Sequence, residues 1–196
     1  MTTLELVAVG TDVARARAAA RSLRGTAFVD ERPEAAGLPF RALVSAVTDD
    51  ADALLAAADV GAYVVCRRVM KSRAAAGGTG SPPGQSLLGV IALYPMVRHP
   101  TLGHGEADRY WRDRHAPLAL RHHVGMSHYT QLSIVHRLHG PEWDGFALCG
   151  FDSLDDLRDR FFDGPEGRVA IREDVARFAD GSRSPRRLIV VEEPYY

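Results

Sequence analysis

The sequence predicts an α+β protein built from two consecutive βαββαβ units whose sheets close into one barrel. The same order of strand and helix patterns occurs twice, and residues 74–86, rich in Gly, Ala, Ser and Pro, separate the two copies as a linker. Several strands are also apolar on both faces. A sheet that carries helices on only one face must cover its other face when that face is apolar. We therefore expect each half to cover the other.

The first half, residues 1–73, shows patterns typical of four strands and two helices. Helix 12–23 is rich in Ala and Arg, which favour helices, and a shorter helix is expected at 50–58. Runs of apolar residues bounded by turn residues predict the strands. These strands are expected at 4–9, 26–30, 40–47 and 62–69.

The second half, residues 87–196, repeats this order with little sequence identity, which suggests a tandem duplication. Ser153 and Asp156 have the spacing of a helix-capping box, and the segment GPEG at 164–167 should break the helical region that follows. Strands are expected at 87–96, 127–138, 143–151 and 187–192, and helices at 106–122 and from 154 to about 179.

The composition excludes several classes of protein. The chain of 196 residues has a formal net charge of −1, without the basic surface that nucleic-acid-binding proteins carry. No apolar run approaches the ~20 residues of a membrane helix, and no basic segment precedes a long apolar core at the N-terminus. We therefore expect a cytoplasmic protein with no nucleic-acid or membrane partner.

Cofactor and nucleophile motifs are missing. Cys66 and Cys149 each lie in an apolar strand-like run, which predicts buried reduced thiols, and Lys71 is the single lysine available for Schiff-base chemistry. The eight histidines have no zinc spacing, and no phosphate-binding or dinucleotide-binding loop is present. We expect no cofactor and no metal site, with a haem bound by a pocket histidine as a minor alternative.

The helix expected at 106–122 places ionisable rings on an apolar face. At ~3.6 residues per turn, one stripe contains Ala107, Trp111, His115, Leu118 and His122. An imidazole shielded from water is suited to acid or base catalysis. The alternative is a structural histidine, since one hydrogen bond from the ring to a backbone carbonyl is enough to bury it.

Other polar groups are expected around the same pocket. In the strand at 127–138, His128 and Thr130 share one face, and Tyr129 and Gln131 share the other. One of these two faces must look toward the helices. Tyr110 lies one position round the helix from Trp111, and Tyr94 and Met96, near the end of the first strand of this half, are candidates for the pocket rim.

Three segments of the second half resemble a known family. YWRDRHAPL at 110–118, SHYTQL at 127–132 and FFDGPEGRVAIREDVARFAD at 161–180 are similar to the EthD family of the dimeric α+β barrel superfamily, whose subunits have a ferredoxin-like βαββαβ fold. The resemblance covers roughly the last 110 residues. Because members usually form a dimer whose two sheets make the barrel, the resemblance implies that the first half is a degenerate partner. The chain is then a monomeric pseudo-dimer or a homodimer, with the first half as scaffold.

The resemblance also implies a hydrophobic pocket for a small organic molecule. We expect cofactor-independent acid/base chemistry of secondary metabolism, namely cyclisation, dehydration or decarboxylation of an aromatic or polyketide-like substrate. His115 is the expected acid or base, and Tyr110, His128 or Tyr129 is the expected hydrogen-bond donor to the enolate. Substrate contacts are expected from Trp111, His122, Tyr129, Tyr94 and Leu118. The alternatives are a cofactor-free monooxygenase, which would depend on oxygen, and a non-catalytic ligand-binding accessory protein, which would tolerate replacement of His115.

Overall fold

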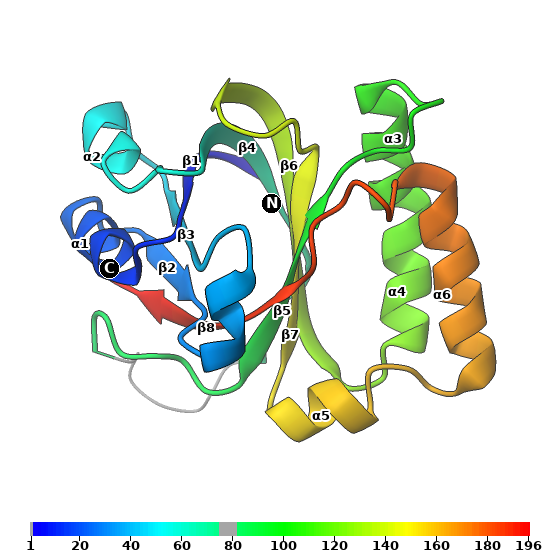
Figure 1. Ribbon diagram of the computed structural model, residues 1–196. Helices are drawn as coiled ribbons and strands as arrows, with labels where there is room; N and C mark the ends of the chain where they lie inside the picture. The colour runs from blue at the N-terminus through cyan, green and yellow to red at the C-terminus, as the bar shows by residue number, and fades with distance from the viewer. Residues whose placement is uncertain (1, 75–81) are drawn as a thin grey trace.

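Eight strands form one closed antiparallel barrel in the computed structural model, which describes residues 2–74 and 82–196 (Figure 1). The strand order around the barrel is β1-β3-β2-β8-β5-β7-β6-β4. The α+β class and the barrel predicted from the sequence are confirmed. Most of the predicted linker, at 75–81, lies outside the described residues.

The first half supplies half of the barrel and two short helices. Asp12 and Asp50 start these helices, because each side chain accepts a hydrogen bond from a backbone N–H of the first turn. The second helix is shorter than the predicted 50–58. The elements are β1 (Thr2–Gly10), α1 (Val13–Ser22), β2 (Thr26–Val29), the 3₁₀-helix η1 (Pro33–Gly37), β3 (Ala42–Ala46), α2 (Ala51–Leu55) and β4 (Gly61–Lys71).

The second half supplies the other four strands and the longer helices. Ser153 caps the N-terminus of its fourth helical segment, as predicted. The helical region does break in two, but the break lies at residues 160–164, and the rest of the GPEG segment forms the first turn of the next helix. The elements are β5 (Val90–Met96), α3 (His104–Tyr110), the π-helical turn η2 (Trp111–His115), α4 (Ala116–His122), β6 (Met126–His139), β7 (Gly145–Phe151), α5 (Leu154–Asp159), α6 (Pro165–Phe178) and β8 (Leu188–Pro194).

The two halves join edge to edge at two places. Strand β4 pairs with β6, and β2 pairs with β8, both antiparallel. The helices lie outside the barrel, with α1 and α2 on one side and α3, α4 and α6 on the other (Figure 1). Closure leaves none of the eight described strands with a free sheet edge, which removes the unpaired backbone groups that an open sheet exposes.

The barrel interior is a core that both halves share. Tyr63 from β4 stacks on Trp143 with ring centroids 6.0 Å apart, and Phe146 from β7 packs edge-on against both rings. Aliphatic residues from both halves complete this core, including Val7, Val9, Leu43, Leu132, Leu148 and Val190. Each half therefore buries apolar surface that it would otherwise expose to water.

The outer layers of the two halves differ in side-chain size. Between the first-half sheet and α1 the buried residues are mainly alanines, which let a helix lie close to its sheet. The corresponding layer of the second half contains large side chains, among them Trp111, Tyr129, Phe151 and Phe178. Large side chains hold the helices further from the sheet, so this layer has room for a cavity.

The predicted continuous helix at 106–122 is interrupted in the middle. Residues Trp111–His115 form a π-helical turn between α3 and α4. Pro117 supplies a reason, because a proline in a regular α-helix clashes with the carbonyl four residues earlier and donates no hydrogen bond to it. A wider turn moves that carbonyl away. The residues that line the space next to the sheet are consequently spaced four apart, at Trp111, His115, Ala119 and His123.

The structure also bears on the predictions for the two cysteines and for membrane helices. Both cysteines are free, but Cys66 is only half-buried whereas Cys149 is buried, so the expectation of two buried thiols is wrong for Cys66. Within residues 2–74 and 82–196, no helix has the length and apolar character needed to cross a bilayer.

Candidate active site

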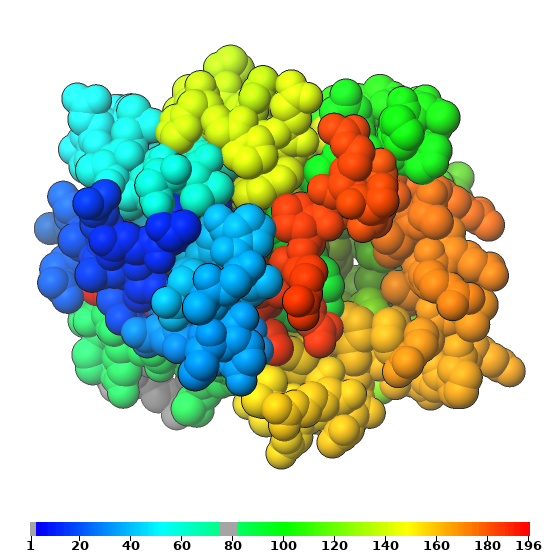
Figure 2. Space-filling model, in the orientation of Figure 1, coloured from blue at the N-terminus to red at the C-terminus, as the bar shows by residue number. Residues whose placement is uncertain are grey.

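A cavity of about 440 Å³ lies between the second-half sheet and the helices α4 and α6. This volume falls in the range of small-molecule sites. Figure 2 shows the molecule hollowed between the red segment that leads into β8 and the orange helix α6. Its wall is mainly apolar, formed by Pro95, Met96, Trp111, Ala119, Ala147, Phe161, Ile171, Val175, Phe178, Ala179 and Pro185.

The loop after α6 closes one side of this cavity. Asp180 holds the loop in shape by accepting hydrogen bonds from the backbone and hydroxyl groups of Ser182. Ser184 then ties the loop to the sheet, because its hydroxyl accepts a hydrogen bond from the backbone N–H of Val97 at 3.0 Å. The loop leads into β8 and carries Arg187 to the cavity.

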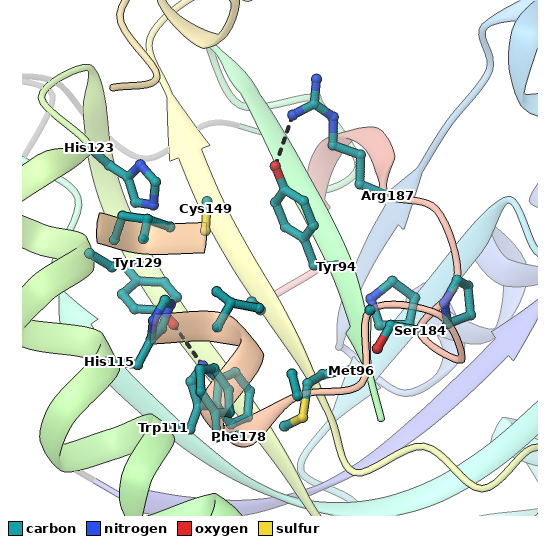
Figure 3. Close-up of a pocket in the computed structure, with 18 of the residues that line it drawn as sticks. Tyr94, Met96, Trp111, His115, His123, Tyr129, Cys149, Phe178, Ser184 and Arg187 are labelled. Carbon is teal, nitrogen blue, oxygen red and sulfur yellow. Dashed lines mark hydrogen bonds between the residues drawn. The ribbon is translucent and has the colours of Figure 1, made fainter. Parts of the chain in front are cut away.

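His115 lines the cavity and forms a buried pair with Asp174, which is not itself part of the lining (Figure 3 shows His115 beside Trp111 and Phe178). The Nδ1 atom of His115 lies 2.8 Å from Oδ2 of Asp174, and the hydroxyl of Tyr110 donates to Oδ1 at 2.7 Å. Asp174 reaches this position because α6 presents it on the same face as Ile171 and Phe178. The π-helical turn presents His115 from the opposite side.

The partners of His115 determine which ring nitrogen carries the hydrogen. Burial alone would raise the pKa of Asp174, but hydrogen bonds from His115 and Tyr110 outweigh it and hold that pKa below its ordinary value. An ionised carboxylate only accepts, so Nδ1 of His115 donates to it. In the neutral ring Nε2 then has the lone pair. Among the described residues, Nε2 makes no hydrogen bond, and the ring lines the cavity.

Tyr129 offers a hydroxyl in the same wall. Its oxygen accepts a hydrogen bond from Nε1 of Trp111 at 3.0 Å, as Figure 3 shows, and another from Nε2 of Gln131 at 3.0 Å. Burial raises the pKa of Tyr129, so the phenol stays protonated. With both interactions accepted, its own hydrogen is available to donate to an oxygen atom bound in the cavity.

His123 is a second imidazole of the wall, and its environment is different. Its Nδ1 lies 2.7 Å from the backbone carbonyl oxygen of Phe161. A carbonyl oxygen only accepts, so Nδ1 carries the hydrogen and Nε2 is a hydrogen-bond acceptor. Burial lowers the pKa of His123 to about 4. His123 is therefore a neutral polar group near neutral pH.

Tyr94 and Arg187 meet at another side of the cavity, as Figure 3 shows. Arg187 donates a hydrogen bond from Nη1 to the Tyr94 hydroxyl at 2.8 Å. Burial raises the pKa of Tyr94 to about 12, and burial likewise raises the pKa of Cys149 to about 12. The Cys149 thiol is thus a poor nucleophile here.

The structure brings together most of the residues expected from the sequence. Trp111, His115, Tyr129, Tyr94 and Met96 all line the cavity. Tyr110 is not part of the lining, and its hydroxyl instead holds Asp174. Tyr110 therefore does not reach the cavity, and it contacts His115 only indirectly, through Asp174.

Three expected residues lie elsewhere. The π-helical turn rotates the following helix, so that Ala119 and His123 face the cavity in place of Leu118 and His122. His122 instead pairs with Asp163, with Nδ1 and Oδ2 2.8 Å apart.

His128 is the third of these residues, and the strand alternation separates it from Tyr129. It faces the barrel side of β6, where its ring lies against Gly150 in a smaller hollow of about 200 Å³. The structure therefore does not bring His128 together with His115.

Sequence reasoning missed Asp174, His123 and Arg187. Asp174 is 59 residues from His115, and no local pattern links a helix carboxylate to a distant histidine. A spacing of four from Trp111 through His115 leads to His123, but only a π-helical turn justifies that spacing. In the described residues no three His, Cys, Asp or Glu side chains gather as a metal site.

Comparison with known proteins connects this site to a family. Residues 99–182 match the model of the EthD domain, and this segment includes His115, His123, Tyr129 and Asp174. The matched segment lies within the second half of the chain. The similarity expected from the three sequence segments is thereby confirmed. A search of curated proteins finds no match to the chain.

A solved structure supports the fold over the whole chain. The crystal structure of an anthrone oxidase-like protein superposes with a TM-score of 0.56 at 14% sequence identity. The alignment covers 99% of this chain and 93% of that chain. At this identity the likeness shows the fold alone, and it extends beyond the EthD segment to the first half.

Proposed function

We propose that this EthD-domain protein is a small-molecule enzyme in which His115 removes a proton from a carbon acid bound in the cavity. The observation that carries the proposal is the His115–Asp174 pair, which leaves the Nε2 lone pair of His115 in an otherwise apolar cavity. General bases act best when a partner fixes the tautomer and stabilises the charge that develops. Asp174 is placed to do both.

The proposed step uses three groups. Nε2 of His115 takes a proton from a carbon next to a carbonyl, the C–H electrons form an enolate, and the charge on the ring is balanced by Asp174. The Tyr129 hydroxyl donates to the enolate oxygen, and its own bonds to Trp111 and Gln131 hold it in place. The apolar wall suits an aromatic or polyketide-like substrate.

In a cyclisation, the enolate carbon then attacks a second carbonyl of the substrate, and the proton on His115 passes to the new alkoxide oxygen. In a dehydration, the enolate expels a β-hydroxyl group, which takes that proton and leaves as water. In a decarboxylation, the enolate forms instead by loss of CO2 from a carboxylate, and protonated His115 returns a proton to the carbon.

Oxygenation is a second candidate, and the name of the structural neighbour favours it. That name refers to the oxidation of an anthrone, a ketone whose methylene group loses a proton to give an enolate. Such a carbanion reduces dioxygen by forming a C–O bond, and protonation gives a hydroperoxide. Loss of water then leaves a second carbonyl. The first step is the same proton removal by His115, and dioxygen is the oxidant.

We also propose that the halves are tandem ferredoxin-like units, with the first as scaffold. Support comes from the strand order, which is β4-β1-β3-β2 in the first half and β8-β5-β7-β6 in the second. Counted within each half, both orders are fourth, first, third, second. A barrel closed within one chain needs no second subunit for its edges, which fits a monomer, and a homodimer of complete barrels is the alternative.

Turnover of anthrone in air tests the proposed function. Anthraquinone formation above the rate in buffer is expected for the unchanged protein. His115→Gln should lower kcat by about a hundredfold or more, and Asp174→Asn by about tenfold or more, because base catalysis contributes roughly 10²–10⁴-fold. His122→Gln is the matched control, since His122 lies outside the cavity.

Four outcomes separate the alternatives. Quinone formation that needs oxygen supports oxygenation, whereas proton exchange at the anthrone methylene group without quinone formation in air supports the cyclase-type reaction. Undiminished turnover by His115→Gln contradicts the mechanism. Binding of anthrone without turnover by any variant identifies a ligand-binding accessory protein instead.

A further inference from the structure

The cavity has a polar side away from His115, formed where β8 begins. Arg187 donates to the Tyr94 hydroxyl at 2.8 Å, and its guanidinium carbon lies 5.9 Å from the ring centroids of both Tyr94 and Phe161. These contacts hold the guanidinium against the aromatic wall of the cavity. Figure 3 shows this pair well separated from His115 and Phe178.

Arg187 is a cation with spare donors. Within residues 2–74 and 82–196 it forms no ion pair with a carboxylate, and the Tyr94 oxygen is the acceptor of its hydrogen bond there. The remaining residues, 1 and 75–81, contain no Asp or Glu. A guanidinium has five N–H donors, so four of them remain for a ligand.

Tyr94 adds a donor of its own at the same place. Its oxygen accepts from Arg187, which leaves the phenol hydrogen free to donate. Two donors, one of them charged, therefore meet at the edge of a cavity whose wall is otherwise mostly apolar. His123, which also contacts Phe161 with ring centroids 4.4 Å apart, is the nearby acceptor.

We propose that Arg187 and Tyr94 form a recognition subsite for an anionic oxygen, so that the ligand of this cavity is an aromatic carboxylate or phenolate. This proposal adds a substrate class to the proposed function. It rests on that function in one respect only, namely that this cavity is the substrate site. The acidic oxygen lies at Arg187 and the aromatic body fills the apolar wall. The reacting carbon then lies toward His115. Arg187 is a specificity-determining residue in this arrangement.

A matched pair of ligands tests the proposal by calorimetry. The probes are 2-naphthoate and the neutral 2-naphthamide, which have the same ring system and nearly the same size. The unchanged protein should bind 2-naphthoate at least about tenfold more tightly, because a charge-assisted hydrogen bond is about twice as strong as a neutral one. Arg187→Met should abolish this preference while changing 2-naphthamide affinity less than about threefold. Tyr94→Phe should reduce the preference in part.

Arg183→Met is the charge control, because Arg183 lies in the same loop but outside the cavity lining. It should keep the preference. An equal loss of affinity for both probes in Arg187→Met overturns the proposal, as does a preference that survives this change, or binding of neither probe to the unchanged protein.

His115→Gln should keep the preference for 2-naphthoate, because the base and the recognition subsite are on different sides of the cavity. Loss of anthrone turnover and loss of the naphthoate preference are therefore independent results. A failed subsite with intact His115-dependent turnover overturns only the present inference, and the reverse result overturns only the catalytic proposal.

Discussion

His115 and His123 line the same cavity, and their hydrogen-bond partners give them different chemistry. Nδ1 of His115 meets a carboxylate, which stabilises the ring when it takes a proton. Nδ1 of His123 meets a carbonyl oxygen, which fixes the tautomer but adds no negative charge. These different partners are the reason why we assign the base to His115 and not to His123.

Stability at low pH tests the description of His123. Burial holds its pKa in the folded protein at about 4, below the ordinary 6.5. As pH falls from 6.5 to 4, the unfolded chain takes a proton at this ring and the folded chain does not, so stability falls. His123→Asn keeps a donor for the Phe161 carbonyl and does not titrate.

Urea unfolding at pH 7 and pH 4.5 measures the effect. Between these pH values the unchanged protein should lose about 2 kcal/mol more unfolding free energy than His123→Asn, at ~1.4 kcal/mol for each pKa unit of difference. All other titrating groups are common to both proteins. Equal losses in the two proteins contradict a neutral buried His123.

At the scale of elements, the sequence predicts the strands and helices well and the helix rotation poorly. Apolar alternation and capping residues locate nearly every element, because these are local properties. The face that α4 turns to the sheet depends on the π-helical turn, which follows from Pro117 and packing together. Leu118 and His122 were expected from a regular helix, and Ala119 and His123 occupy their places.

The close contact between β7 and the π-helical turn is a second feature that the sequence alone did not indicate. Gly145 lies under the Trp111 ring, and a Cβ atom there would lie 2.6 Å from the ring and 2.8 Å from the backbone oxygen of Leu132. Gly145→Ala should therefore lower the unfolding free energy by roughly 1–3 kcal/mol, the usual cost of overpacking.

Chemical denaturation of Gly145→Ala measures this cost. The control is Gly37→Ala, because nothing lies within 4 Å of a Cβ atom at Gly37. Gly37→Ala should leave stability nearly unchanged. A Gly145→Ala protein as stable as the control would show that Trp111 is not seated against β7 as described.

At the scale of the molecule, two similar halves have one shared core and two different outer layers. The repeated element order predicts the barrel, because each sheet needs a cover for its apolar inner face. Which outer layer contains a cavity depends on side-chain volume, and here the alanines of the first half contrast with the aromatic residues of the second. The Asp174–His115 contact also belongs to this scale, because it joins two helices that only the complete fold brings together.

The two tryptophans of the chain report on different layers of this architecture. Trp143 packs inside the barrel and Trp111 lies between the sheet and the helices. Strands β6 and β7 contribute to both layers, so the layers should unfold together. The variants Trp111→Phe and Trp143→Phe each keep one tryptophan. In each variant, the urea unfolding transition measured by fluorescence should coincide with the transition measured by circular dichroism. A fluorescence transition clearly separate from it contradicts a single cooperative barrel.

The most direct test of the central claim is proton exchange in the absence of oxygen. Anthrone is incubated in D2O under nitrogen with the unchanged protein or with His115→Gln, and deuterium at its methylene group is measured by mass spectrometry. Because oxygenation and cyclase-type chemistry share the first step, the unchanged protein should accelerate exchange over buffer and His115→Gln should not. Equal acceleration by both proteins, or none by the unchanged protein although it binds anthrone, would contradict His115 as the base.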